Sequence, residues 1–345
     1  MKKVTLIASI MLVLGVFPLL AGGGSQKPVD SGAKAPAATS GKKAPVIAFV
    51  PKVIGQAWWD YTRDAGVLAW GKETGNNVMY KGPTEVDAAA QVQIMTDLVA
   101  QGVDILCFSP NDPASLENIC KEARAKGIIV VCTEASGMTN IDYDIEAFDE
   151  KGFGGFMMDI LGDQMGGTGK WVQTVGSFTM ESQVNWADAA LARQQEKYPK
   201  LELVPDKRVE DGSDAENSYE LAKQLIKKYP DLKGFQCNGS FGAPGVCRAI
   251  QELGRKDILV VGTTIPSEVR DYLKSGILKA GALWDPALSA KAMLNLGMKM
   301  YNGEKITDGM DLGIKGYNNV KITGKVIQGQ GMIAITKDNV DNFTF

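Results

Sequence analysis

The chain alternates between short strand-like runs and longer segments in which apolar residues recur at helical spacing. The first such runs are VIAFV (46–50), NVMYK (77–81), VDILCF (103–108) and GIIVVCT (127–133), with a helix predicted over 56–74 between the first two. In the segment after residue 87, Ala90, Ile94 and Leu98 fall on one helical face. Most strand-like runs are continuously apolar, which is typical of parallel strands covered on both faces.

The same alternation begins again after residue 150. Strands are predicted at 171–176, 201–204, 232–237, 258–262 and 278–284, and helices at 151–165, 185–197, 215–228, 243–253, 267–275 and 288–301. The sequence after 301 contains few strand-like runs. Two consecutive arrays of this kind predict an α/β protein with two doubly wound, parallel-sheet domains that face each other.

The first 45 residues differ from the rest. A basic head, Met1-Lys2-Lys3, precedes an uncharged apolar run that reaches Gly22, so residues 1–22 are predicted to be an export signal. A retained membrane anchor is the alternative, because the run approaches the ~18 residues of a spanning helix. Gly23 stands where a bacterial lipoprotein would have cysteine, so lipidation is not predicted. Residues 23–45 are rich in Gly, Ser, Ala and Pro and are predicted to be a flexible tether.

Charge and composition exclude several classes of function. The formal net charge is −3 and the charges are scattered, which argues against a nucleic-acid surface. The chain has no histidine, which excludes Ser-His-Asp and Cys-His catalysis and histidine-ligated metals. The five cysteines show no CxxC spacing and predict neither a zinc site nor a disulfide framework, although a Cys237–Cys247 bond remains open.

Polar or aromatic residues follow almost every predicted strand. In doubly wound sheets, ligands bind beyond the carboxyl ends of the strands, so these positions are the candidate site. They are Lys52 with the aromatic residues after it, and the segments 82–85, 109–112, 133–134, 177–183, 238–240, 263–264 and 284–285. Three of them, Trp58, Trp59 and Trp284, are costly to expose unless a flat, partly apolar molecule covers them. A tryptophan pair in the core is the alternative for Trp58 and Trp59.

Two apparent motifs do not predict chemistry. GGTGK (166–170) lacks the first glycine of a phosphate-binding loop and has Trp171 in place of Ser or Thr, so it is better interpreted as a helix-terminating turn. Asp142 and Asp144 could pair for acid–base work, but carboxylates near a domain crossover are more often solvated or hydrogen-bonded. No nucleophile with an adjacent base is evident, so the chain is predicted not to be an enzyme.

Five stretches resemble one family. They are FVPKVIGQAWW, YKGPTEVDAAAQVQIMTDLVAQGVD, ESQVNW, TTIPSEVRDYLKSGILKAGALWD and NVDNFTF. They are similar to type I periplasmic solute-binding proteins of ABC sugar importers, most closely to the autoinducer-2-binding and rhamnose-binding branch. The resemblance implies two Rossmann-like lobes joined by a multi-crossover hinge. The N-terminal lobe would comprise 46–148 with about 286–316, and the C-terminal lobe 149–285 with about 317–345.

The resemblance also implies which residues contact the ligand. Lys52 matches a lysine of the autoinducer-2 binders, and Trp58 and Trp59 match two aromatic residues that follow it. Gln183 matches a glutamine, whereas Glu134 stands where the branch has aspartate. Ser182, Asn238 and Ser240 also depart from the pattern, and Trp284 and Asp285 match a Leu-Trp-Asp run.

These residues suit a sugar, which offers hydroxyl groups on its edge and C–H groups on its faces. Lys52 would donate hydrogen bonds, Glu134 and Asp285 would accept them, and Gln183 and Asn238 could do either. The three tryptophans would cover the apolar face. The departures from the branch fall on the polar contacts, so the pattern does not identify the sugar.

The predicted function is therefore a monomeric, extracytoplasmic binding protein, without cofactor or metal, that closes on a monosaccharide or autoinducer-2-like compound. It would deliver this ligand to an inner-membrane ABC permease. A sensor coupled to a membrane chemoreceptor is the alternative, because either partner would recognise the closed form. An extracytoplasmic enzyme and a DNA-binding regulator are less favoured.

Overall fold

The computed structural model describes residues 43–345, so the predicted export signal and all but the end of the tether lie outside the described part. Residues 44–345 form one compact unit with two parallel-rich sheets. Within residues 43–345, no helix has the length and apolar character that crossing a membrane requires.

The first sheet has the strand order β12-β13-β5-β4-β3-β1-β2. The elements of this lobe that precede the first crossover are β1 (Ile47–Val50), α1 (Ala57–Tyr61), η1 (Thr62–Leu68), α2 (Ala69–Thr74), β2 (Val78–Tyr80), α3 (Ala88–Gln101), β3 (Ile105–Phe108), α4 (Pro113–Ala125), β4 (Ile129–Cys132) and β5 (Tyr143–Glu146). Strands β1 to β5 are parallel to their neighbours.

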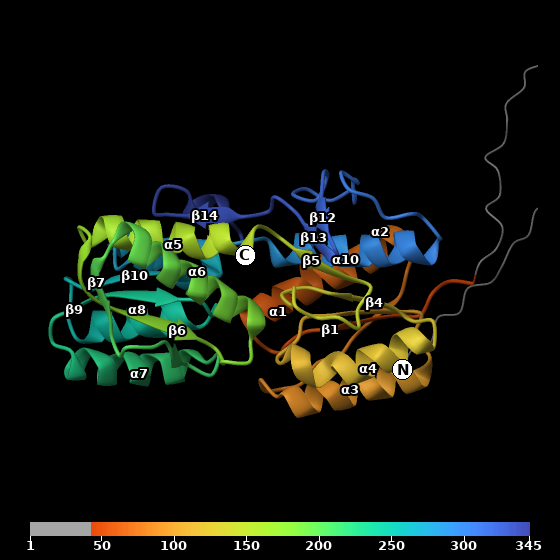
Figure 1. Cartoon of the computed structure of the whole chain (residues 1–345), viewed down its shortest axis with the longest axis horizontal. Helices are drawn as coiled ribbons and strands as arrows, with labels where there is room; N and C mark the ends of the chain where they lie inside the picture. Colours follow the sequence, from red (N-terminus) through yellow and green to blue (C-terminus); the bar gives the residue numbers. More distant parts are fainter. Residues whose placement is uncertain (1–42) are drawn as a thin grey trace, which may run out of the picture. The chain divides into compact units, whose positions relative to one another are not determined.

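Both faces of the first sheet are covered, as the continuously apolar strands predict. Ala48 and Val50 of β1 pack with α3 and α4 in one buried cluster, whereas Ile47 and Phe49 belong to a second cluster on the opposite face. In Figure 1, α3 and α4 lie on one side of this sheet and α10 (Pro286–Tyr301) lies on the other. The α10 helix packs on η1, β3 and β4.

The predicted helix over 56–74 is α1, η1 and α2 in succession, with a π-helical turn in its middle. Gly66 of η1 allows α10 to approach closely, because a Cβ atom there would lie 3.0 Å from the Cα atom of Ala287. A π-helical turn changes which side chains face the neighbouring element. The irregularity therefore adapts this helix to its packing against α10.

The second sheet has the order β14-β11-β10-β9-β6-β7, and β8 also pairs with β6. The elements of this lobe are α5 (Glu150–Gln164), β6 (Thr168–Val175), α6 (Glu181–Lys197), β7 (Lys200–Leu203), β8 (Val209–Glu210), α7 (Ala215–Lys228), β9 (Leu232–Cys237), α8 (Gly242–Glu252), β10 (Leu259–Thr263), α9 (Pro266–Ser275), β11 (Leu278–Leu283), β14 (Ile333–Ile335) and η2 (Val340–Asn342). The pairings among β6, β7, β8, β9, β10 and β11 are parallel, and β14 is antiparallel to β11.

The C-terminal segment differs from the expected lobe boundary. Residues 321–328 form β12 (Lys321–Thr323) and β13 (Val326–Gln328), and β13 pairs with β5 of the first sheet. The expectation that 317–345 belongs wholly to the second lobe is therefore wrong for these strands. Each of these strands has only three residues, which is too short for a strand to be recognised from hydrophobic periodicity. The chain passes between the lobes after β5, after β11 and after β13.

Candidate ligand-binding site

The carboxyl ends of both sheets face a shared pocket. Its lining includes eight of the nine predicted site residues: Lys52, Trp58, Trp59, Glu134, Gln183, Asn238, Ser240 and Trp284. It also includes Met180 and Thr263, which lie in the candidate segments 177–183 and 263–264, and six residues outside the predicted positions: Val53, Gln56, Val86, Trp186, Ser213 and Phe241. The strand-tip argument thus located the pocket, because parallel strands bring their carboxyl ends to one edge.

A buried ion pair lies in this lining. Lys52 follows β1 and Glu134 follows β4, and their Nζ and Oε2 atoms are 2.6 Å apart with side chains 6% and 8% exposed. Glu134 has a φ of 61°, in the left-handed region that non-glycine residues rarely adopt. Such backbone strain persists where the surroundings determine it, often at functional sites. Ser182 of the second lobe donates a hydrogen bond to the same Glu134 oxygen at 3.2 Å.

A hydrogen-bonded network beneath the pocket holds Lys52. Gln91 of α3 is fully buried, and its Nε2 donates to the carbonyl oxygens of Pro51 and Ser109 at 3.0 and 2.8 Å. Its Oε1 accepts a hydrogen bond from the backbone N–H of Asn111, whose Nδ2 donates to the Lys52 carbonyl at 2.7 Å. The ends of β1 and β3 are thereby fixed to each other, and Lys52 is pre-positioned.

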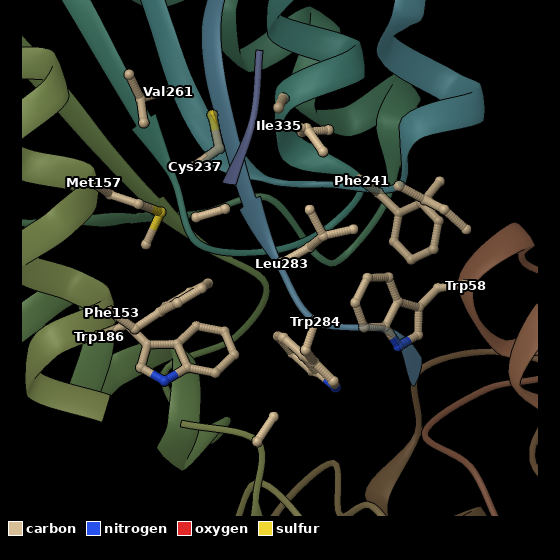
Figure 2. Close-up of a cluster of buried hydrophobic side chains, with 14 of the residues drawn as sticks. Trp58, Phe153, Met157, Trp186, Cys237, Phe241, Val261, Leu283, Trp284 and Ile335 are labelled. Atoms are coloured by element: carbon tan, nitrogen blue, oxygen red, sulfur yellow. The ribbon is translucent and has the colours of Figure 1, made fainter. Parts of the chain in front are cut away.

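The aromatic side of the pocket continues into the core. Trp58 and Trp284 pack edge to face with ring centroids 4.7 Å apart, and Trp186 lies 5.6 Å from Trp284 on its other side. Figure 2 shows Trp284 between Trp58 and the pair formed by Phe153 and Trp186. Trp58 is 3% exposed and Trp59 is 7% exposed, so both rings are buried, and both also line the pocket. Their contact with a ligand stays a prediction.

The second lobe contributes amide and hydroxyl groups. Gln183 of α6 accepts a hydrogen bond from the Gly176 N–H at 2.6 Å, which fixes its side chain beside the pocket. Asn238 follows β9, and its Nδ2 donates to the Thr174 carbonyl while its Oδ1 accepts from Gln236. The Asn238 amide is thus engaged with protein groups on both sides. The second N–H and the second oxygen lone pair of the amide have no partner in these two bonds, so a ligand contact by Asn238 stays a prediction.

Several hydrogen bonds cross between the lobes around the pocket. Gln56 Nε2 donates to the Ser213 carbonyl at 3.4 Å, and Thr179 Oγ1 donates to the Asn111 carbonyl at 3.4 Å. Glu181 accepts a hydrogen bond from the Gly137 N–H at 2.6 Å. These contacts hold the two walls together. The pocket they enclose has a free volume of about 30 Å³, room for about one or two water molecules. A monosaccharide therefore enters only after the walls separate or the lining side chains rearrange.

Carboxyl groups with raised pKa values lie on β5 of the first lobe and at the start of α5 in the second. Burial raises the pKa of Asp144 on β5 to about 6, and it raises that of Glu146 well above the usual value, helped by the charge of Asp144. Burial also raises the pKa of Glu150, at the start of α5, to about 7. Asp144 accepts hydrogen bonds from Ala135 N–H and Cys132 Sγ. This agrees with the expectation that the carboxylates near the crossover are hydrogen-bonded.

Asp285 is the predicted site residue that does not line this pocket. Its Oδ1 accepts from the N–H groups of Ala287 and Leu288 at 2.9 and 3.1 Å, so it caps the N-terminus of α10. The role that the structure shows for Asp285 is therefore a helix cap, whereas its predicted hydrogen bond to the ligand stays a prediction. Trp284 enters the pocket and Asp285 begins the next helix, because the chain turns into α10 between them.

Metal and disulfide chemistry receive no support from residues 43–345. Within this range no group of Cys, Asp and Glu side chains is arranged to hold a metal ion. All five cysteines are buried with free thiols, including Cys237 and Cys247. Burial raises the pKa of each thiol, which keeps it in the unreactive neutral form.

Comparison with known proteins gives a family match along most of the chain. The model of a periplasmic binding protein domain matches residues 47–305. The D-allose-binding periplasmic protein of Escherichia coli (strain K12) is 26% identical over 262 residues, covering 72% of this chain and 82% of the relative. The ribose import binding protein RbsB of Bacillus subtilis (strain 168) is 24% identical over 224 residues, covering 64% and 70%.

Solved structures share the fold. LsrB from Clostridium saccharobutylicum in complex with AI-2 superposes with a TM-score of 0.79 at 21% identity, covering 87% of this chain and 100% of that one. An ABC transporter solute-binding protein from Clostridium phytofermentas with bound L-rhamnose also gives 0.79 at 20% identity, covering 87% and 98%. The resemblance inferred from the sequence is confirmed, as is the two-lobed fold.

Proposed function

The chain belongs to the periplasmic binding protein family, and from this premise we propose that it captures a neutral monosaccharide or autoinducer-2-like compound between its lobes and delivers it to an ABC import permease. The relatives reported above are named as a D-allose-binding periplasmic protein and a ribose import binding protein, both sugar-binding proteins and not enzymes.

The observation that carries the proposal is the pairing of Lys52 with Glu134 beside an aromatic wall. Both charged groups can hydrogen-bond ligand hydroxyls, and charged partners make stronger hydrogen bonds than neutral ones. They are the charged residues of the pocket lining, with one of each sign, so the lining is electrically neutral. A neutral polyhydroxylated ligand suits this lining, whereas a sugar acid or an amino sugar would add an uncompensated charge.

Capture would be coupled to closure because both lobes contribute to the lining. Lys52, Glu134 and Trp58 come from the first lobe, and Gln183 and Ser240 come from the second. A ligand that contacts both walls binds the closed form more tightly than the open form, and this difference in affinity drives closure. A membrane permease that recognises the closed form would then distinguish loaded from empty protein.

Titration of the purified protein tests the proposal. The probes are D-allose, D-ribose, L-rhamnose, D-xylose, D-galactose and autoinducer-2, with D-galacturonate and D-glucosamine as charged counterparts. We expect one neutral probe to change the tryptophan fluorescence and to give saturable heat in calorimetry, and the charged probes to give neither. A lack of response to every neutral probe, together with no small molecule released on denaturing the purified protein, would contradict the proposal.

A further inference from the structure

Several polar groups in the pocket lining already have protein partners. Lys52 and Glu134 pair with each other, Gln183 Oε1 accepts from Gly176 N–H, and the Asn238 amide is engaged on both sides. These bonds fix the positions of the groups, and the remaining N–H groups of the Lys52 ammonium and the Gln183 amide can still donate to a ligand. A buried polar atom that lacks any partner is a more specific indication of where a ligand hydroxyl lies.

Three lining residues carry such an atom. Gln56 Oε1, Thr263 Oγ1 and Trp186 Nε1 are buried, and none of them has a hydrogen-bond partner within residues 43–345. The first two are oxygen atoms that can accept from a hydroxyl group, whereas the indole N–H only donates. A buried polar atom without a partner costs about 1–3 kcal/mol, and such atoms are few in folded proteins. Their presence in the lining of one pocket is therefore a feature that a bound molecule would explain.

The orientation of the Gln56 amide follows from its contact across the cleft. Its Nε2 donates to the Ser213 carbonyl, which can only accept, so the oxygen of the amide is the atom left over. Gln56 immediately precedes α1 and belongs to the first lobe, whereas Thr263 ends β10 in the second. The two unpartnered oxygen atoms thus come from opposite walls of the pocket.

We propose that Gln56 Oε1 and Thr263 Oγ1 form a subsite that recognises hydroxyl groups of the ligand from both lobes. The inference rests on the proposed function and deepens it. Gln56 Oε1 only accepts and so requires a hydroxyl donor, whereas the Thr263 hydroxyl both donates and accepts. Because Gln56 is held by Ser213 only when the lobes are together, this recognition belongs to the closed form. The subsite therefore favours a fully hydroxylated sugar over a deoxy analogue that lacks the contacted group.

A matched pair of variants tests the subsite. Thr263→Val removes the lining hydroxyl with little change in shape, and Thr264→Val does the same at the next residue, whose Oγ1 is also buried and unpartnered but does not line the pocket. We expect both variants to unfold at the same temperature as the wild type or higher, because each removes an unsatisfied polar atom. Only Thr263→Val should weaken binding of the neutral sugar selected by the titration, by about tenfold or more.

Gln56→Met supplies the second arm, since it keeps the length of the side chain while removing both polar atoms. It should also weaken binding, and Thr263→Val should reduce the preference for the selected sugar over its deoxy analogue. Unchanged affinity in Thr263→Val, or equal losses in Thr263→Val and Thr264→Val, would overturn the subsite while the proposed function stands. Failure of the wild type to bind any neutral probe, together with no small molecule released on denaturing the purified protein, would overturn the proposed function and the subsite with it.

Discussion

The ammonium group of Lys52 lies 2.6 Å from the carboxylate of Glu134, and both side chains are almost excluded from water. Each charge depends on the other, because an isolated buried charge is far more costly than a buried pair. Ser182 reaches the same carboxylate from the second lobe at 3.2 Å. The ion pair therefore contributes to the stability of the first lobe and also to the closed arrangement of the pocket.

Lys52→Ala should weaken binding of the selected neutral sugar by about 10–100-fold, because a charged hydrogen-bond donor is lost. It should also destabilise the fold by about 3–5 kcal/mol, since Glu134 remains buried without its partner. The double variant Lys52→Met/Glu134→Gln should recover most of the stability but not the affinity. Denaturant unfolding and calorimetric titration measure the two effects. Full affinity in the double variant would remove the pair from the site.

Trp58→Phe should reduce the fluorescence response to ligand and weaken binding several-fold, because the larger indole contributes more contact area and an edge-to-face partner for Trp284. Trp171→Phe is the matched control. Trp171 is fully buried in β6 and does not line the pocket. It should lower the total fluorescence but keep the ligand-induced change and the affinity. The prediction fails if the two variants respond alike.

The sequence was sufficient for most of the fold because apolar runs and helical spacing mark buried elements directly. The sequence did not predict β5 or β8, and it predicted no strand after residue 301. In β5, two of the four residues are the buried acids Asp144 and Glu146, so its hydrophobic pattern is hidden. The strands β8, β12, β13 and β14 have two or three residues each and depend on pairing with a neighbour.

The pocket could be predicted as far as strand ends define it. Lys52 and Glu134 stand directly after apolar runs, and their meeting follows from parallel topology. Thr263 also stood at a strand end, but only the structure reveals that its hydroxyl lacks a partner. Gln56, Trp186 and Phe241 line the pocket because of how the two walls pack together. This packing depends on contacts between residues that are far apart in the sequence, and local sequence patterns do not predict such contacts.

Asp285→Ala should destabilise the protein by about 0.5–2 kcal/mol while leaving ligand affinity unchanged, because its carboxylate caps α10. Asp285→Asn should restore most of the loss, since asparagine is an equally good N-cap. Chemical denaturation with parallel titrations measures both quantities. An affinity loss in Asp285→Asn at normal stability would return this residue to the binding site.

The ligand-free protein should become less stable as pH rises from 5 to 8. Burial raises the pKa of Glu150 to about 7, with further contributions from the charges of Asp144 and Glu181. Glu150 therefore keeps its proton in the folded state at pH values where the unfolded state, with the usual pKa of 4.5, has already released it. The stability that this proton contributes is fully present below pH 4.5 and is lost as pH rises through about 7. The loss should amount to roughly 1–3 kcal/mol.

The contacts of Ser136 give this pH dependence a structural origin at the closed cleft. Its Oγ lies 3.1 Å from Glu150 Oε2 and 3.3 Å from Glu181 Oε1, yet one hydroxyl proton can serve only one carboxylate. A protonated Glu150 supplies the second proton, so both contacts form together at low pH. Glu150→Gln should flatten the dependence of unfolding free energy on pH, whereas Glu196→Gln, an exposed change on α6, should leave it unaltered. An equally steep dependence in Glu150→Gln would assign the effect to other buried acids, with Asp211, whose pKa burial raises to about 6, as the next candidate.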